Sequence, residues 1–142
     1  MKTLNPWQSY KKVATTTASP GQLVLMLYEG ALRFLEQAKT AFHCDDPLDF
    51  NLNVCTNVQK AQAIINELSL SLNMQAGGEF AANQRRLYNY LDRRLQESNL
   101  RKDLDGINEV IHRLTIIKDA WAEMLQTGAA FRESPVPLAM AG

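Results

Sequence analysis

The feature of this sequence that most constrains its fold is a spacing of three and four between apolar residues, which recurs in four long stretches. That spacing places the apolar side chains on one stripe of an α-helix, and the stripe must pack against other helices to leave water. Strand-like alternation of apolar and polar residues is sustained nowhere. Four helices of roughly 20 residues with short connections predict an all-α, antiparallel four-helix bundle.

The first stretch has a clear helix start. Ser19 is a good cap residue, Pro20 suits the first helical position, and Gln22 stands three residues after the serine, as in a capping box. The turn-forming residues 45–47 predict where this helix ends. Its expected core stripe comprises Leu23, Leu27, Gly30, Phe34, Ala38 and Ala41.

Three more helices follow. The second is expected over about residues 48–72, the third over about 80–99 after a pair of glycines, and the fourth after a cap at Asp103 or Asp105. The bundle should therefore occupy residues 19–127. The expected core residues of these helices are Val54, Val58, Ala61, Ile65, Leu68, Leu72, Leu87, Leu91, Leu95, Ile107, Val110, Ile111, Leu114, Trp121 and Leu125.

The bundle is flanked by two segments without helical periodicity. Residues 1–18 form an N-terminal arm with two large aromatic side chains, Trp7 and Tyr10. Ordering such side chains without burying them gains nothing, so we expect the arm to cover apolar surface. Residues 128–142 contain two prolines and are expected to form a disordered tail.

Composition excludes several classes of function. Fifteen basic and fifteen acidic residues cancel, so the chain has no general attraction to nucleic acid or anionic membranes. The arginines of the third helix spread around it rather than forming one stripe, which favours a solvated face. No segment approaches the ~20 consecutive apolar residues of a membrane-spanning helix, and no signal pattern is present. We therefore expect a cytoplasmic protein with no nucleic-acid partner and no membrane insertion.

Metal and catalytic motifs are weak. Glu109 and His112 form a Glu-x-x-His pair, but a di-iron bundle needs two such pairs, and Thr40 stands where the glutamate paired with His43 would be. Glu109 and His112 are also expected on the outer face of their helix, as solvated residues. Residues 43–46 lack a recognised ligand spacing. The sequence predicts no enzyme activity, no cofactor and no metal.

The first two helices carry more apolar surface than one core stripe uses. At about 100° per residue, several apolar positions fall opposite the expected core stripes. A second subunit, a partner segment or the aromatic arm would cover this surplus. An irregular bundle that packs both faces internally accounts for it equally well. The surplus residues are Leu25, Tyr28 and Leu32 on the first helix and Leu52, Ala63 and Leu70 on the second.

Together these segments resemble the FliS family of flagellar secretion chaperones. NPWQSY at residues 5–10 is similar to the family's N-terminal signature, with Trp7 in place of a tyrosine. SPGQLVLMLYEGALRF at residues 19–34 is similar to its first-helix motif, with Gln22 and Glu29 as small departures. The resemblance covers about residues 4–125 in order, and its specificity lies in the combination of motifs.

The resemblance implies a chaperone that holds the C-terminal segment of flagellin in grooves between helices and prevents premature polymerisation. It also implies delivery to the flagellar type III export apparatus, with other flagellar regulators as further partners, and an arm that leaves its groove when flagellin arrives. We expect a monomer or weak dimer. The candidate partner-binding residues are Pro6, Trp7, Tyr10, Leu25, Leu32, Leu52, Ile64 and Leu70.

The alternative function is purely structural. In that reading, the bundle buries its surplus apolar faces in a homodimer and has no client. Sedimentation of the purified chain with and without flagellin separates the two hypotheses.

Overall fold

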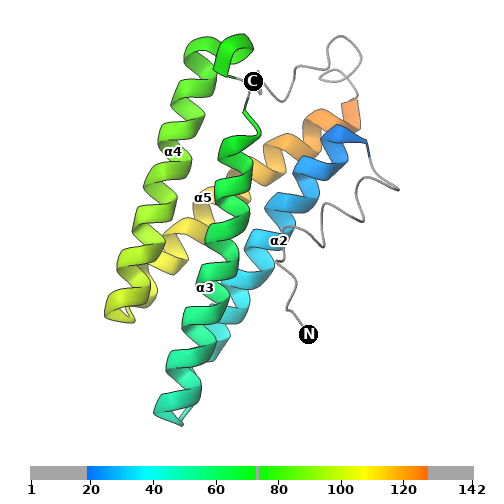
Figure 1. The fold of residues 1–142 in the computed structure, drawn as a ribbon. Coiled ribbons are helices and arrows are strands. Elements are labelled where there is room, and N and C mark those ends of the chain that lie inside the picture. Colours follow the sequence, from blue (N-terminus) through cyan, green and yellow to red (C-terminus); the bar gives the residue numbers. More distant parts are fainter. Residues whose placement is uncertain (1–18, 73, 128–142) are drawn as a thin grey trace, which may run out of the picture.

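The predicted four-helix bundle is confirmed in the computed structural model, which describes residues 19–72 and 74–127 (Figure 1). The helices are α2 (Pro20–Ala41), α3 (Pro47–Leu70), α4 (Met74–Arg101) and α5 (Leu104–Thr127). Within these residues there is no strand. The arm and the tail expected from the sequence lie outside the described residues.

The predicted helix starts are confirmed by their caps. Ser19 Oγ accepts a hydrogen bond from the backbone N–H of Gln22 at 3.2 Å, and α2 begins directly after this serine. Asp46 Oδ1 accepts from the N–H of Leu48 at 3.0 Å at the start of α3. Asp103 accepts from the N–H two residues later at 2.9 Å, so it caps α5. Each cap satisfies a backbone donor that has no partner within its helix.

The start of α4 differs from the expected one. The sequence predicts that the glycine pair separates helices and that the third helix begins near Phe80. Helical structure instead begins at Met74, and only Gly78 leaves it, with φ 57° and ψ −135°. Because glycine tolerates positive φ, one residue absorbs the change of direction and the helix continues after a kink.

The four helices form a closed ring of neighbours. α2 packs against α3 and α5, and α4 packs against the same two helices. α2 and α4 therefore face each other across the diagonal of the bundle. Figure 1 shows α4 and α5 close together near their connection and separated toward the other end, where α2 begins and α3 ends.

The core follows the expected stripes on α3 and departs from them on α2. Five of the six residues predicted for this stripe are buried on α3, and the sixth, Leu72, is buried just beyond its end; Ile64, which was expected on the surface, is buried as well. On α2, Leu23 and Phe34 are only partly buried, whereas Tyr28, which was placed on the surplus face, is 3% exposed. α2 lies between two neighbours, so its buried arc is wider than one stripe and is shifted toward Tyr28. The fully buried large side chains are Leu27, Leu35, Val54, Val58, Ile64, Ile65, Leu91, Leu95, Ile107, Val110 and Leu114.

Candidate functional site

A cavity of about 280 Å³ lies at the end of the bundle where α4 and α5 separate. All four helices contribute to it, through the start of α2, the end of α3, the first half of α4 and the second half of α5. We call it the end pocket. Its lining residues are Val24, Tyr28, Leu68, Ser71, Leu72, Phe80, Gln84, Tyr88, Ile116, Ile117, Ala120, Trp121 and Met124.

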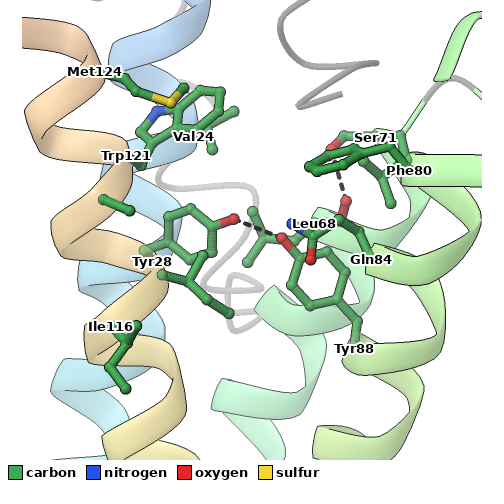
Figure 2. A pocket seen from close by; sticks show the side chains of 13 residues that line it. Val24, Tyr28, Leu68, Ser71, Phe80, Gln84, Tyr88, Ile116, Trp121 and Met124 are labelled. Carbon is green, nitrogen blue, oxygen red and sulfur yellow. Dashed lines mark hydrogen bonds between the residues drawn. The ribbon is translucent and has the colours of Figure 1, made fainter.

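A pair of tyrosines crosses the end pocket (Figure 2). Tyr28 Oη of α2 and Tyr88 Oη of α4 are 2.6 Å apart, and both side chains are 3% exposed. Burial raises the pKa of both phenols, and the pKa of Tyr88 is raised further by the neighbouring Tyr28. Both hydroxyls therefore stay neutral at physiological pH and act as a polar link inside an apolar pocket.

Trp121 forms another wall of the end pocket. Its indole Nε1–H donates to the backbone oxygen of Gly21 at 3.0 Å, which joins the last turns of α5 to the first turn of α2. The buried indole thereby satisfies its only polar atom and presents its apolar rings to the pocket. This end of the bundle is thus held between α2 and α5, and α4 adds Phe80, Gln84 and Tyr88 to the lining.

The rim of the pocket reaches the surface through two large apolar side chains. Phe80 of α4 is 47% exposed and Ile116 of α5 is 57% exposed. Gln84 and Ser71 add uncharged polar groups, and no lining residue carries a charge. Such a pocket suits apolar side chains of a protein segment, with a few polar groups to orient it.

Neither rim residue was identified from the sequence. Phe80 was treated only as the start of a helix, and Ile116 was not singled out. The signal for Ile116 is its neighbour Ile117, because consecutive helical residues point about 100° apart and cannot both lie at the centre of one stripe. Ile117 is the partly buried member of the pair.

The structure places the candidate residues of the sequence analysis in three environments. Leu52 and Leu70 of α3 are 58% and 69% exposed, so they are available to a partner. Leu25 and Leu32 of α2 are partly buried against the core. Ile64 is fully buried and is not available on the surface. Three further candidates lie outside the described residues: Pro6, Trp7 and Tyr10.

Glu109 corrects the expectation of a solvated Glu-x-x-His pair. Its carboxylate accepts hydrogen bonds from Tyr90 Oη at 2.6 Å, Arg94 Nε at 2.8 Å and Arg113 Nε at 2.9 Å. The hydrogen bonds from Tyr90 and Arg94 lower the pKa of Glu109 to about 2. This cluster, the Glu109 network, joins α4 to α5. His112 is exposed, as expected.

The Glu109 network depends on the packing of α4 against α5, which brings Tyr90 and Arg94 to the carboxylate of Glu109. Arg94, read as part of a solvated basic face, instead bonds to a carboxylate of the neighbouring helix at 2.8 Å. Arg113 Cζ lies 5.7 Å from the ring centre of Tyr90, a cation–π distance. In the part of the chain that the structure describes, no group of three or more His, Cys, Asp or Glu is placed to hold a metal ion.

None of the helices within 19–72 and 74–127 is both long and apolar enough to cross a membrane.

Comparison with known proteins gives one consistent result. Residues 3–128 match the family model described as "Flagellar protein FliS". The "Flagellar secretion chaperone FliS" of Bacillus subtilis is 37% identical over 123 residues, which cover 87% of this chain and 88% of the relative. The protein of the same name in Salmonella typhimurium is 38% identical over 122 residues, or 85% of this chain and 87% of the relative. The "Flagellar secretion chaperone FliSB" of Pseudomonas aeruginosa is 31% identical, covering 85% of this chain and 94% of the relative.

Proposed function

Because the chain belongs to the FliS family, we propose that it is a cytoplasmic, non-enzymatic export chaperone for flagellin. It binds the disordered C-terminal segment of flagellin and prevents premature polymerisation. It then supports delivery of that client to the flagellar type III export apparatus. The chaperone acts as a monomer or weak dimer, and other flagellar regulators are further partners.

The observation that carries this proposal is the uncharged end pocket. Its rim exposes Phe80 and Ile116, and its wall includes the rings of Tyr28, Tyr88 and Trp121. A client segment that folds into an amphipathic helix can bury its apolar side chains in such a groove. No ion pair of the chaperone has to break, because no lining residue is charged. Coupled folding and binding of this kind suits a disordered client.

A second contact line runs along α3. Leu52 and Leu70 are 18 residues apart, which is five helical turns, so they project in the same direction about 27 Å apart. A client that wraps the bundle would cover both leucines. Leu25 and Leu32 of α2, which are partly buried against the core, would supply further contacts.

The aromatic arm belongs to the same proposal. Pro6, Trp7 and Tyr10 cover apolar surface of the free chaperone and leave it when flagellin arrives. The physical basis is competition, since a longer client buries more apolar area than the local arm does.

Binding to two forms of flagellin tests the function. The purified chaperone is titrated calorimetrically with the flagellin encoded in the same genome, either intact or without its C-terminal segment. We expect 1:1 binding to the intact protein and no binding to the truncated one. Equal binding to both would refute the specificity for the C-terminal segment. If sedimentation instead shows a tight chaperone dimer whose sedimentation coefficient does not change when flagellin is added, the structural alternative would be supported.

Two surface variants locate the client site. Ile116→Asp places a charge on the rim of the end pocket, and Leu100→Asp places one on an exposed leucine of α4, which is 74% exposed. Leu100 lies 12 residues beyond Tyr88, about 18 Å along the helix. Ile116→Asp should weaken flagellin binding about tenfold or more through lost apolar burial, and Leu100→Asp should not. Equal effects would place the client elsewhere.

A further inference from the structure

The end pocket lies beside the point where the chain leaves the bundle. Met124 lines the pocket, and α5 ends three residues later at Thr127. Residues 128–142 continue from there, and the family match stops at residue 128. The rest of this segment is therefore not part of the pattern that defines the family.

The chemistry of this segment matches the chemistry of the pocket. Residues 134–142, SPVPLAMAG, carry no charged side chain and include Val136, Leu138 and Met140. The pocket lining has no charged residue either, so burying apolar side chains there leaves no charged group without water or a partner. The N-terminal arm is less suited, because Lys11 and Lys12 directly follow its second aromatic residue.

The length of the apolar part of this segment also matches the length of the pocket wall. Each residue that precedes a proline is biased toward extended backbone, and this applies to Ser134 and Val136. In an extended chain alternate residues share one side, so positions 136, 138 and 140 form an apolar edge about 13 Å long. α5 contributes a wall from Ile116 to Met124, which is about 12 Å long along the helix axis.

The connecting residues are long enough for the segment to turn back. Residues 128–133 provide six residues, which span up to about 20 Å when extended. The rim residue Ile116 lies 11 residues before the end of α5, about 17 Å along its axis. The segment can therefore fold back along the wall and reach the exposed rim.

We propose that residues 134–142 dock in the end pocket as an internal competitor of the client. Val136, Leu138 and Met140 enter the pocket, and Ala139 faces away from it. The free chaperone then shields Phe80 and Ile116, and a client must displace the tail. The competition rests on the proposed function, whereas the docking does not.

Thiol reactivity of the full-length chain tests the docking. In a Cys44→Ser, Cys55→Ser background, Ile116→Cys reports the rim and Leu100→Cys reports the far end of α4. The tail variant combines Leu138→Asp with Met140→Asp, and Ala139→Asp is its matched control. The tail variant should raise the reaction rate of the thiol at position 116 about tenfold, through loss of apolar burial. The control should leave that rate unchanged, and neither change should affect position 100.

Two results would overturn the proposal. One is an equal rate at position 116 for the wild-type tail, the tail variant and the Ala139→Asp control. The other is a rate that rises with Trp7→Asp but not with the tail variant, because the arm would then be the occupant.

Calorimetry with flagellin separates this proposal from the proposed function. Tighter flagellin binding by the tail variant supports competition, and unchanged affinity refutes it. Protection of the thiol at position 116 without any flagellin binding would leave the docking supported while the chaperone function fails.

Discussion

Tyr28 and Tyr88 meet across the diagonal of the bundle, with their hydroxyl oxygens 2.6 Å apart and both rings buried. They link α2 to α4, two helices that otherwise pack mainly against α3 and α5 and not against each other. The link also lies in the wall of the end pocket. Its strength therefore affects both the stability of the bundle and the shape of the candidate client site.

Removing one hydroxyl of this pair should cost more than removing both. Tyr88→Phe leaves the Tyr28 hydroxyl buried without its partner and should lower the free energy of unfolding by about 1–2 kcal/mol. Tyr28→Phe should behave similarly, and the double variant should cost less than either single variant, because no buried hydroxyl is then left without a partner. Urea denaturation of all four proteins measures the cycle. Strictly additive losses would show that the two hydroxyls are not coupled.

Acid should weaken the Glu109 network. The pKa of Glu109 in the folded chain is about 2, below its ordinary value of 4.5. A lowered pKa stabilises the fold at pH values above 4.5, and this contribution is lost as pH falls from 4.5 toward 2. Glu109→Gln should therefore destabilise the bundle at pH 7, with a difference from wild type that shrinks across this interval. Denaturation at several pH values measures it, with Glu36→Gln on the exposed face of α2 as control.

Replacing Gly106 or Gly78 by alanine should lower the stability of the bundle for different reasons. A Cβ at Gly106 would lie 2.8 Å from Ser98 Oγ and 2.9 Å from Ser98 Cβ, and Ser98 is fully buried. Overpacking costs about 1–3 kcal/mol, partly offset by the higher helix propensity of alanine, so Gly106→Ala should destabilise the bundle. At Gly78 there is open space, and the cost of alanine, about 1–2 kcal/mol, comes from the positive φ alone.

Thermal denaturation of the two alanine variants distinguishes these causes. Replacing Gly106 by serine should be worse than alanine, because the larger side chain enters the same crowded space. At Gly78, asparagine should be tolerated no better than alanine, because φ 57° with ψ −135° lies outside the left-handed helical region that asparagine favours. A stabilising Gly106→Ala would contradict the close approach of α5 to Ser98.

The exposed leucines of α3 should separate binding from stability. Leu70→Asn changes a side chain that is 69% exposed, so the free energy of unfolding should move by less than about 0.5 kcal/mol. Flagellin affinity should fall if α3 carries the second contact line. Asn53→Gln, exposed on α3 but about 100° away from the line through Leu52 and Leu70, is the control for binding. A large loss of stability with unchanged affinity would make Leu70 a structural residue.

Fluorine NMR should follow the arm and the pocket in one sample. The chain has two tryptophans, and 5-fluorotryptophan labels both Trp7 and Trp121. Trp121 lines the end pocket, so its resonance should shift when flagellin binds there. The Trp7 resonance should shift as well if the arm is displaced, and Trp7→Phe assigns the signals. Confirmed binding with an unchanged Trp7 signal would refute displacement of the arm.

The sequence by itself determined the four helices and their ends, apart from the start of α4. Ser19 and Asp103 act locally, because a cap needs only a side chain and a backbone N–H a few residues away. The stripe predicted for the second helix is buried as expected, since helical periodicity fixes which residues share a face, but Ile64 beside it was predicted to lie on the surface. The combination of segment motifs was sufficient for the resemblance to the FliS family, which the comparisons confirmed.

The tertiary structure decided which apolar faces are covered. Tyr28 became core because α2 lies between two neighbours, and Ile64 did so because the buried arc of α3 is wide. Ile116 stayed exposed at the rim of the end pocket. Glu109 acquired its partners only when Tyr90 and Arg94 approached from another helix. Periodicity assigns a side chain to a face of its own helix, whereas burial, pairing and the end pocket depend on the distance and tilt of the neighbouring helices.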